Sequence, residues 1–226
     1  MTELAAAWKD LQLNTKELEQ RTDTSRLRAG RNEVWIPFKA PFNSTDLIAG
    51  EPLRRLLSAY WPGDSAVLDH ISIINAVPGS KAQPLHSDVL APRSHLEFHT
   101  PLVDITPDLG PTRFCPCTQY MATGNASAEE GWRFVAPAKL CEAEPSLGYS
   151  FAPASPGTVT VYDAAVVHGG GAVVSTQERP ILQLSFASSE ASQRQRAYLE
   201  QGFRDGENAD SGRALAMAEA QRFREA

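Results

Sequence analysis

The central part of the chain, from about residue 60 to about residue 188, alternates short apolar and β-branched runs with proline and glycine turns. The runs are HISIINAV (70–77), LEFHTPLVDI (96–105), GTVTVYDAAVVH (157–168) and PILQLSFAS (180–188). Strands at this spacing, separated by turn residues, are typical of an all-β sandwich or barrel. The sequence therefore predicts a mainly β fold.

Helical composition flanks this β region on both sides. Leucine and tryptophan recur at helical spacing between charged residues near the N-terminus, which predicts a helix over residues 1–22. A second helix is expected over about 46–60, and the residues after 188 again have a helix-rich composition. We expect the terminal helices to pack against the sheet or to form a homodimer contact.

Chain length limits the number of domains. The chain has 226 residues, of which 42% are hydrophobic, and this is enough for one sizeable core. We therefore expect a single domain over 1–226, with a β core at about 31–188. The N-terminal helix 1–22 and the C-terminal helices 189–226 are expected to pack outside that core.

The distribution of charged and apolar residues excludes two classes of partner, nucleic acid and membrane. The formal net charge is −6, and the lysine and arginine residues are scattered along the chain. Nucleic acid is not an expected partner, because binding it needs a clustered basic face. The N-terminus lacks a basic segment followed by an apolar one, and no apolar run approaches the roughly 18 to 20 residues of a membrane span. We expect a cytoplasmic protein with no membrane partner.

The three cysteines are an odd and small number for a secreted protein held together by disulfides. Cys115 and Cys117 form a C-x-C pair, but the distant Cys141 does not complete the paired spacing of a structural zinc site. We expect buried or partly exposed thiols in a reducing compartment.

The first candidate site lies in the segment Gln83-Pro84-Leu85-His86-Ser87-Asp88. On an extended strand, side chains at i and i+2 point to the same face, so His86 and Asp88 project together. An imidazole and a carboxylate in this arrangement can bind one metal ion. The alternative is a surface turn, in which the Asp88 side chain bonds to the local backbone.

The second candidate site is His168, which follows a predicted strand and precedes three glycines. Glycine permits close approach of the backbone to another group, although a lone histidine in an apolar run is more often a core residue. Arg179 shares strand parity with Gln183 and Ser185, on the more polar face of its strand. If that face lines a barrel interior, the guanidinium needs a buried anion. An exposed strand-end arginine is the alternative.

These residues resemble one known family. His-x-Asp, a distal histidine and an arginine eleven residues further on are similar to the phytanoyl-CoA dioxygenase-like branch of the iron/2-oxoglutarate oxygenases. The resemblance covers residues from about 31 to 186 and includes Pro78-Gly79-Ser80 before the first ligand. His86-Ser87-Asp88 also resembles the ligand tripeptide of ectoine hydroxylases. The resemblance implies a double-stranded β-helix, also called a jelly roll or cupin-like fold, with flanking α-helices.

The resemblance also implies the chemistry. Fe(II) would be held by His86, Asp88 and His168, a 2-His-1-carboxylate set that leaves positions open on the ion. The cosubstrate 2-oxoglutarate would place its distal carboxylate on Arg179, whose fork suits a bidentate contact. With O2, the expected reaction is hydroxylation of a small-molecule metabolite or natural-product intermediate, with release of succinate and CO2.

Three further residues resemble positions that line the cosubstrate site in relatives: Asn75, Gln83 and Thr112. Asn75 shares parity with the isoleucines of its strand, so its amide is expected to face the interior, with a strand-end hydrogen bond as the alternative. One departure is Gly170, because relatives often carry a hydroxyl residue there. Another group or water must then replace that hydrogen bond.

Two other functions remain open on the sequence alone. A cupin-like metalloenzyme without a keto acid, such as an isomerase, would need the same metal ligands but would leave Arg179 without a partner. A non-catalytic β-sandwich binding protein would need neither the ligands nor the arginine. Asp163 is expected to serve a turn or to support the ligand residues rather than to act in catalysis, and His99 either borders the pocket or is an ordinary strand residue.

Overall fold

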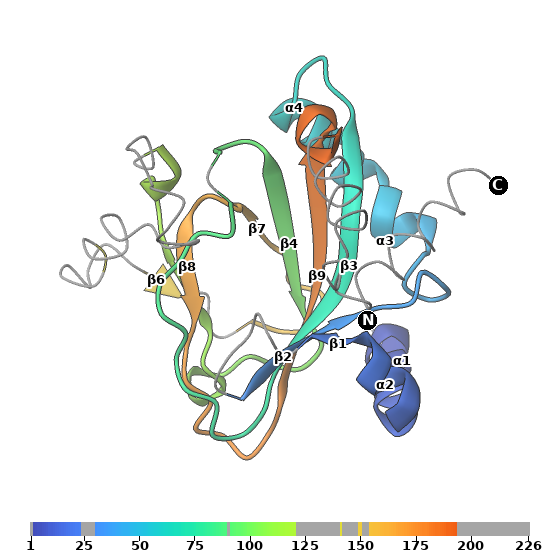
Figure 1. Cartoon of the computed structure of the whole chain (residues 1–226), viewed down its shortest axis with the longest axis vertical. Coiled ribbons are helices and arrows are strands. Elements are labelled where there is room, and N and C mark those ends of the chain that lie inside the picture. Colours follow the sequence, from blue (N-terminus) through green and yellow to red (C-terminus); the bar gives the residue numbers. More distant parts are fainter. Residues whose placement is uncertain are drawn as a thin grey trace, which may run out of the picture.

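Two antiparallel sheets face each other in the computed structural model, which describes residues 2–23, 30–89, 91–120, 141, 149–150 and 154–193 (Figure 1). The larger sheet has the spatial order β1 (Thr22–Asp23), β2 (Arg31–Trp35), β3 (Ala66–Ala76), β9 (Arg179–Ser188), β4 (His95–Pro101) and β7 (Thr160–Asp163). The smaller sheet has the order β6 (Tyr149–Ser150), β5 (Thr112–Cys115) and β8 (Val167–Gly170). The predicted double-stranded β-helix is confirmed.

The strand boundaries differ from the prediction in two places. The run 96–105 forms β4 only as far as Pro101, and the run 157–168 divides into β7 and β8. A turn separates β7 from β8, because the Asp163 carboxylate accepts a hydrogen bond from the Ala165 amide at 2.9 Å. The Val166 amide also donates to the Asp163 carbonyl at 2.8 Å. The expected turn role of Asp163 is confirmed, and this turn sets the start of the strand that carries His168.

The outer face of the larger sheet is apolar and holds the main core. Leu182, Leu184 and Phe186 of β9 lie in one buried cluster with Ile71 and Ile73 of β3. Helix residues complete the same cluster: Leu4, Trp8, Leu11, Leu57. The inner face of the sheet carries the polar residues of β9. The larger sheet therefore buries its apolar side under helices and turns its polar side towards the smaller sheet.

The expected N-terminal helix is two helices, α1 (Thr2–Leu13) and α2 (Thr15–Arg21). The break lies at Asn14, whose side chain accepts a hydrogen bond from the Glu17 amide and so caps the second helix. Figure 1 places both helices outside the larger sheet. Leu4, Trp8 and Leu11 of α1 lie in the same buried cluster as the apolar residues of the sheet.

The expected helix over 46–60 is also divided, into α3 (Thr45–Ala49) and α4 (Glu51–Tyr60). Gly50 between them is extended, with ψ 151°, and Pro52 lies in the first turn of the second helix. Short 3-10 helices, η1 (Pro107–Leu109) and η2 (Thr118–Tyr120), flank β5. Of the predicted C-terminal helices, residues 189–193 are helical, and the rest lie outside the described residues.

The thiol prediction is wrong for two of the three cysteines. Cys115 and Cys141 form a disulfide with a Cα–Cα distance of 6.1 Å, whereas Cys117 is free and exposed. Their separation of 26 residues gives no signal of pairing, because connectivity is not fixed by sequence. The cysteines therefore do not support the expected reducing compartment. No helix in the described ranges is long and apolar enough to cross a membrane.

The packing of α1 gives a prediction about stability. Trp8 is 4% exposed in the main core, whereas Leu13 on the same helix is 82% exposed. Trp8→Ala is expected to lower the free energy of unfolding by about 3 to 5 kcal/mol, and Leu13→Ala by less than about 0.5 kcal/mol. Urea unfolding of the two variants measures the difference. Equal decreases in the free energy of unfolding for the two variants would contradict the packing of α1 on the sheet.

Candidate metal centre

The segment that carries His86 and Asp88 is held along β8 by backbone hydrogen bonds. The His86 amide donates to the His168 carbonyl at 2.9 Å, and the His168 amide donates back at 2.8 Å. The Asp88 amide donates to Ala164 at 2.9 Å, and the Ser87 hydroxyl donates to Ala165 at 2.9 Å. This pairing places His86 opposite His168, although the two residues are far apart in sequence.

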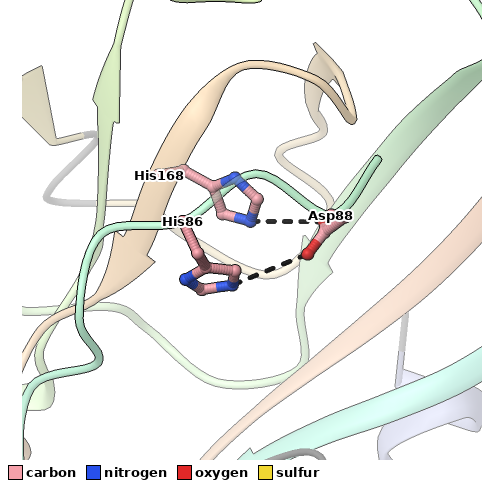
Figure 2. A group of neighbouring side chains, drawn as sticks. All are labelled: His86, Asp88 and His168. Carbon is pink, nitrogen blue, oxygen red and sulfur yellow. Dashed lines mark ion pairs between the residues drawn. The ribbon is translucent and has the colours of Figure 1, made fainter. Parts of the chain in front are cut away.

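Three side chains converge at this point (Figure 2). His86 Nε2 lies 3.6 Å from Asp88 Oδ1, and His168 Nε2 lies 3.4 Å from Asp88 Oδ2. One ligand atom from each residue falls within 4.8 Å of the others. Metal–ligand bonds of about 2 Å put the ligand atoms of one ion roughly 3 to 4 Å apart. The group therefore has the size of a metal site.

The hydrogen bonds of the two imidazole rings fix which nitrogen faces the group. His86 Nδ1 lies 2.8 Å from the Pro84 carbonyl oxygen, and His168 Nδ1 lies 2.9 Å from the Val166 carbonyl oxygen. A carbonyl only accepts, so Nδ1 carries the proton and Nε2 presents a lone pair towards Asp88. Burial lowers the pKa of His168, which favours the neutral, ligating form.

One side of the group is open. The side chains of His86 and Asp88 are 28% and 36% exposed, whereas that of His168 is 7% exposed. Two imidazole nitrogens and one carboxylate, with open positions beside them, match the donor set of non-haem Fe(II) oxygenases. Catalytic zinc also accepts three such ligands. His86, Asp88 and His168 fit a metal ion, and the residues around them indicate which reaction that ion would serve.

Aromatic residues enclose His168. The Phe114 ring stacks on it with 5.9 Å between centroids and 21° between planes. The Tyr162 hydroxyl lies 3.5 Å from His168 Nε2 and 3.1 Å from His99 Nε2. Burial lowers the pKa of His99 to about 3, so the imidazole is neutral. Tyr162 was not predicted from the sequence; it lies on β7 two residues after Thr160.

A pocket extends from this aromatic wall into the space between the sheets. Its lining residues come from both sheets and the loops between them: His99, Pro101, Ile105, Pro111, Thr112, Phe114, Ala154, Thr160, Ile181. Thr112 was expected to line the cosubstrate site, and it does line this pocket. His99 also borders it, which decides between the two alternatives for that residue.

Arg179 is buried at the inner face of β9, with 1% exposure. Its Nη1 donates to the Gly110 carbonyl, and its Nε is buried without a partner among the described residues. Burial, and then the positive charge of Arg31, lowers the pKa of Arg179 to about 10. The interior position is confirmed and the exposed alternative is excluded. The guanidinium has a charge that lacks a carboxylate partner in the described part of the chain.

Gln83 contacts the strand that carries His168. Its backbone amide donates to the Gly170 carbonyl at 2.8 Å, and its side-chain Oε1 accepts a hydrogen bond from the Gly170 backbone amide at 2.8 Å. Gln83 therefore fixes the ligand segment to the end of β8, close to Arg179.

Asn75 does not face the interior, and that prediction is wrong. It lies opposite Pro180 in the register of β3 and β9, on the face of Ile73. Its amide donates at 3.1 Å to the Glu178 carboxylate, which also accepts from Gln12 of α1 at 2.9 Å. The strand-end hydrogen bond was the correct alternative, because the isoleucine face of β3 is covered by helices.

A buried carboxylate lies on the inner face of the larger sheet, on β4 beside β9. Glu97 accepts hydrogen bonds from Gln183 at 2.8 Å and Ser185 at 2.7 Å. It is 3% exposed, and burial raises its pKa to about 7, while the opposing charge of His70 is smaller in effect. No role for Glu97 was predicted from the sequence.

The Glu97 carboxylate makes stability depend on pH. Because its folded pKa lies above the ordinary value of 4.5, the folded state binds more protons than the unfolded state between pH 4.5 and about 7. The free energy of unfolding of the metal-free protein should therefore fall by roughly 3 kcal/mol as pH rises through that window. Glu97→Gln should remove most of this fall, since Gln183 can rotate its amide to keep a hydrogen bond. Exposed Glu51→Gln is the control, and equal pH profiles for both variants would contradict the assignment.

Comparisons with known proteins agree with this geometry. The family model described as phytanoyl-CoA dioxygenase (PhyH) matches residues 2–181. No curated protein sequence matches the chain. The crystal structure of AviO1 from Streptomyces viridochromogenes Tue57 has a TM-score of 0.56 at 20% identity, covering 83% of this chain and 83% of that one.

Two other solved structures share the fold with ligands bound. The epimerase SnoN, in complex with Fe3+, alpha ketoglutarate and nogalamycin RO, has a TM-score of 0.56 at 18% identity over 82% of this chain and 74% of its own. HygX from Streptomyces hygroscopicus, with nickel, 2-oxoglutarate and hygromycin B bound, has a TM-score of 0.50 at 13% identity over 80% and 79%. At these identities the likeness concerns the fold.

Proposed function

Since the chain belongs to the phytanoyl-CoA dioxygenase family, we propose that it is a non-haem Fe(II)/2-oxoglutarate-dependent oxygenase that hydroxylates a small-molecule metabolite or natural-product intermediate. His86, Asp88 and His168 hold the iron, and Arg179 binds the distal carboxylate of the cosubstrate. Thr112 lines the cosubstrate pocket, and Gln83 holds the ligand segment on β8. Bound Fe(II) and 2-oxoglutarate together supply, with O2, the oxidant that removes hydrogen from the substrate, with release of succinate and CO2.

The observation that carries this proposal is the buried, unpaired guanidinium of Arg179 in the same interior as the metal group. A buried charge without a counter-ion is costly, and a dianionic keto acid supplies the missing charge. Iron contributes +2, Asp88 −1 and the keto acid −2, so the filled site would carry a net negative charge without a cation near the distal carboxylate. A metalloenzyme without a keto acid leaves this cation unexplained, and so does a non-catalytic binding protein.

The chain's own side chains orient the two reactants. Pro84 and Val166 carbonyls hold the imidazole rings so that both Nε2 atoms face Asp88. Phe114 lies against His168 and keeps water from that ligand. The exposed sides of His86 and Asp88 mark the direction from which a substrate reaches the centre.

Epimerisation is the second reaction class that a specific observation favours. SnoN is an epimerase with the same fold, and HygX holds hygromycin B. The same metal-binding and cosubstrate-binding residues would serve either reaction. Analysis of product mass separates them, because hydroxylation adds one oxygen atom and epimerisation adds none.

The test is an anaerobic titration of the metal-free protein with Fe(II) and then 2-oxoglutarate, followed by visible absorbance. A weak charge-transfer band is expected only when both are present. A protein that binds the metal but never develops the band would reject the proposal and favour a cupin-like enzyme without a keto acid.

A further inference from the structure

Three residues form a row across the inner face of the larger sheet. Arg31 of β2 lies opposite Ala76 of β3, and Ala76 lies opposite Arg179 of β9. Directly opposite residues of antiparallel strands project to the same face. Arg31 is 3% exposed and Arg179 is 1% exposed, so two buried guanidinium groups flank one methyl group.

The contacts of these two arginines leave their charges unneutralised. Arg31 donates to the carbonyls of Lys81 and Gly171, and Arg179 donates to that of Gly110. Both Nε atoms are buried without a hydrogen-bond partner among the described residues. Within the same ranges, neither arginine forms an ion pair with a carboxylate. Two neighbouring buried cations without a counter-ion constitute a site for an anion.

Gly170 of β8 closes this site from the smaller sheet. A Cβ atom on Gly170 would lie 2.8 Å from Arg179 Nη2, 2.8 Å from Gln83 Oε1 and 3.3 Å from Arg31 Nε. A side chain at this position would therefore require the guanidinium end of Arg179 and the amide end of Gln83 to shift. Gly170 therefore lies directly against the guanidinium groups of both Arg179 and Arg31.

We propose that Arg31 is a second anion-binding residue, and that Arg31 and Arg179 together bind the distal carboxylate of 2-oxoglutarate beside Gly170, a position that carries no hydroxyl. This inference rests on the proposed function, because it takes 2-oxoglutarate as the anion. Arg31 supplies a full positive charge and the Nε donor where a hydroxyl would supply one neutral donor. The site formed by Arg31 and Arg179 should therefore bind a keto acid that has a distal carboxylate much more tightly than a keto acid that lacks one.

The test compares two keto acids on the same proteins. Fe(II)-loaded protein is titrated anaerobically with 2-oxoglutarate and with pyruvate, which lacks the distal carboxylate, and the charge-transfer band gives the dissociation constants. Arg31→Gln is expected to raise the constant for 2-oxoglutarate about 10- to 100-fold and that for pyruvate less than about twofold. Arg55→Gln, on exposed α4, is the matched loss of one arginine and should change neither.

Two further variants keep the test decisive if Arg31→Gln does not fold. Arg31→Lys keeps the charge but not the fork, and should weaken 2-oxoglutarate binding by less than Arg31→Gln does. Gly170→Ser introduces a hydroxyl into the space of the guanidinium groups and should weaken 2-oxoglutarate binding instead of strengthening it.

The outcomes separate this inference from the function beneath it. If the wild-type protein gives no band with 2-oxoglutarate, the proposed function fails. If the wild-type band is present and Arg31→Gln leaves both dissociation constants unchanged, Arg31 only donates hydrogen bonds to the Lys81 and Gly171 carbonyls. The inference then fails. Equal weakening of both keto acids would also overturn it, because the effect would then lie at the metal.

Discussion

Replacing His168 by alanine is expected to weaken Fe(II) binding more than about 100-fold and to abolish the 2-oxoglutarate charge-transfer band. Loss of an outer hydrogen-bond partner of a ligand already costs 10- to 100-fold in metal affinity, so loss of the ligand itself should cost more. His168 is also the most enclosed of the three, with a 7% exposed side chain, so water cannot readily replace its nitrogen. Equilibrium dialysis with Fe(II) measures the affinity, and succinate formation measures turnover.

The control for this variant is another histidine of the same region. His95, at the start of β4, does not belong to the group of possible metal ligands in the described residues. His95→Ala should therefore keep the Fe(II) affinity of the wild-type protein. Unfolding temperatures of both metal-free variants show whether each is folded. A folded His168→Ala protein that retains both Fe(II) affinity and the band would refute the assignment of this ligand.

Much of the site was predictable because, in extended backbone, residues an even number of positions apart project to the same side. The pairs His86 with Asp88, and Arg179 with Gln183, project together in the structure as their spacing predicts. What the sequence does not contain is the pairing register. The bridge between His86 and His168 brings together residues 82 positions apart, and only the family resemblance linked them.

The error at Asn75 has a definite physical cause. Asn75 shares its strand face with Ile71 and Ile73, as predicted, but that face is the outer face of the sheet and not the interior one. Helices cover the outer face of the larger sheet, so the outer face is apolar and the interior is polar. The same rule, applied to β9, correctly placed Arg179 inside. Consistent use of the polar face as the interior one would have corrected Asn75.

Other features were missed for reasons of local chemistry or of register. The helix breaks at Asn14 and Gly50 lie at residues that commonly end or cap helices, so the signals were present. Arg31 was not recognised, because its row with Arg179 depends on strands that are remote in sequence. The pairing of Cys115 with Cys141 has no sequence signal. The extent of the domain over 1–226 stays a prediction.

Replacing Arg179 by glutamine is expected to weaken 2-oxoglutarate binding by roughly 100-fold or more, which corresponds to about 3 kcal/mol. The buried guanidinium loses both its charge and its fork-shaped contact with the carboxylate. Metal binding should remain, because Arg179 does not contact the three ligand residues in the structure. Titration of the charge-transfer band in Fe(II)-loaded protein measures the change.

The stability of the same variant gives an independent reading. In the metal-free and cosubstrate-free protein, Arg179 is a buried cation whose pKa is lowered to about 10 by burial, so its removal should not lower the unfolding temperature much. Saturating 2-oxoglutarate should raise the unfolding temperature of the Fe(II)-loaded wild-type protein, but not that of Arg179→Gln at the same concentration. Arg55→Gln, with an 80% exposed side chain, should behave as the wild type. An Arg179→Gln protein that turns over substrate fully without 2-oxoglutarate would mean that the buried cation serves another anion, and the keto-acid mechanism would have to be abandoned.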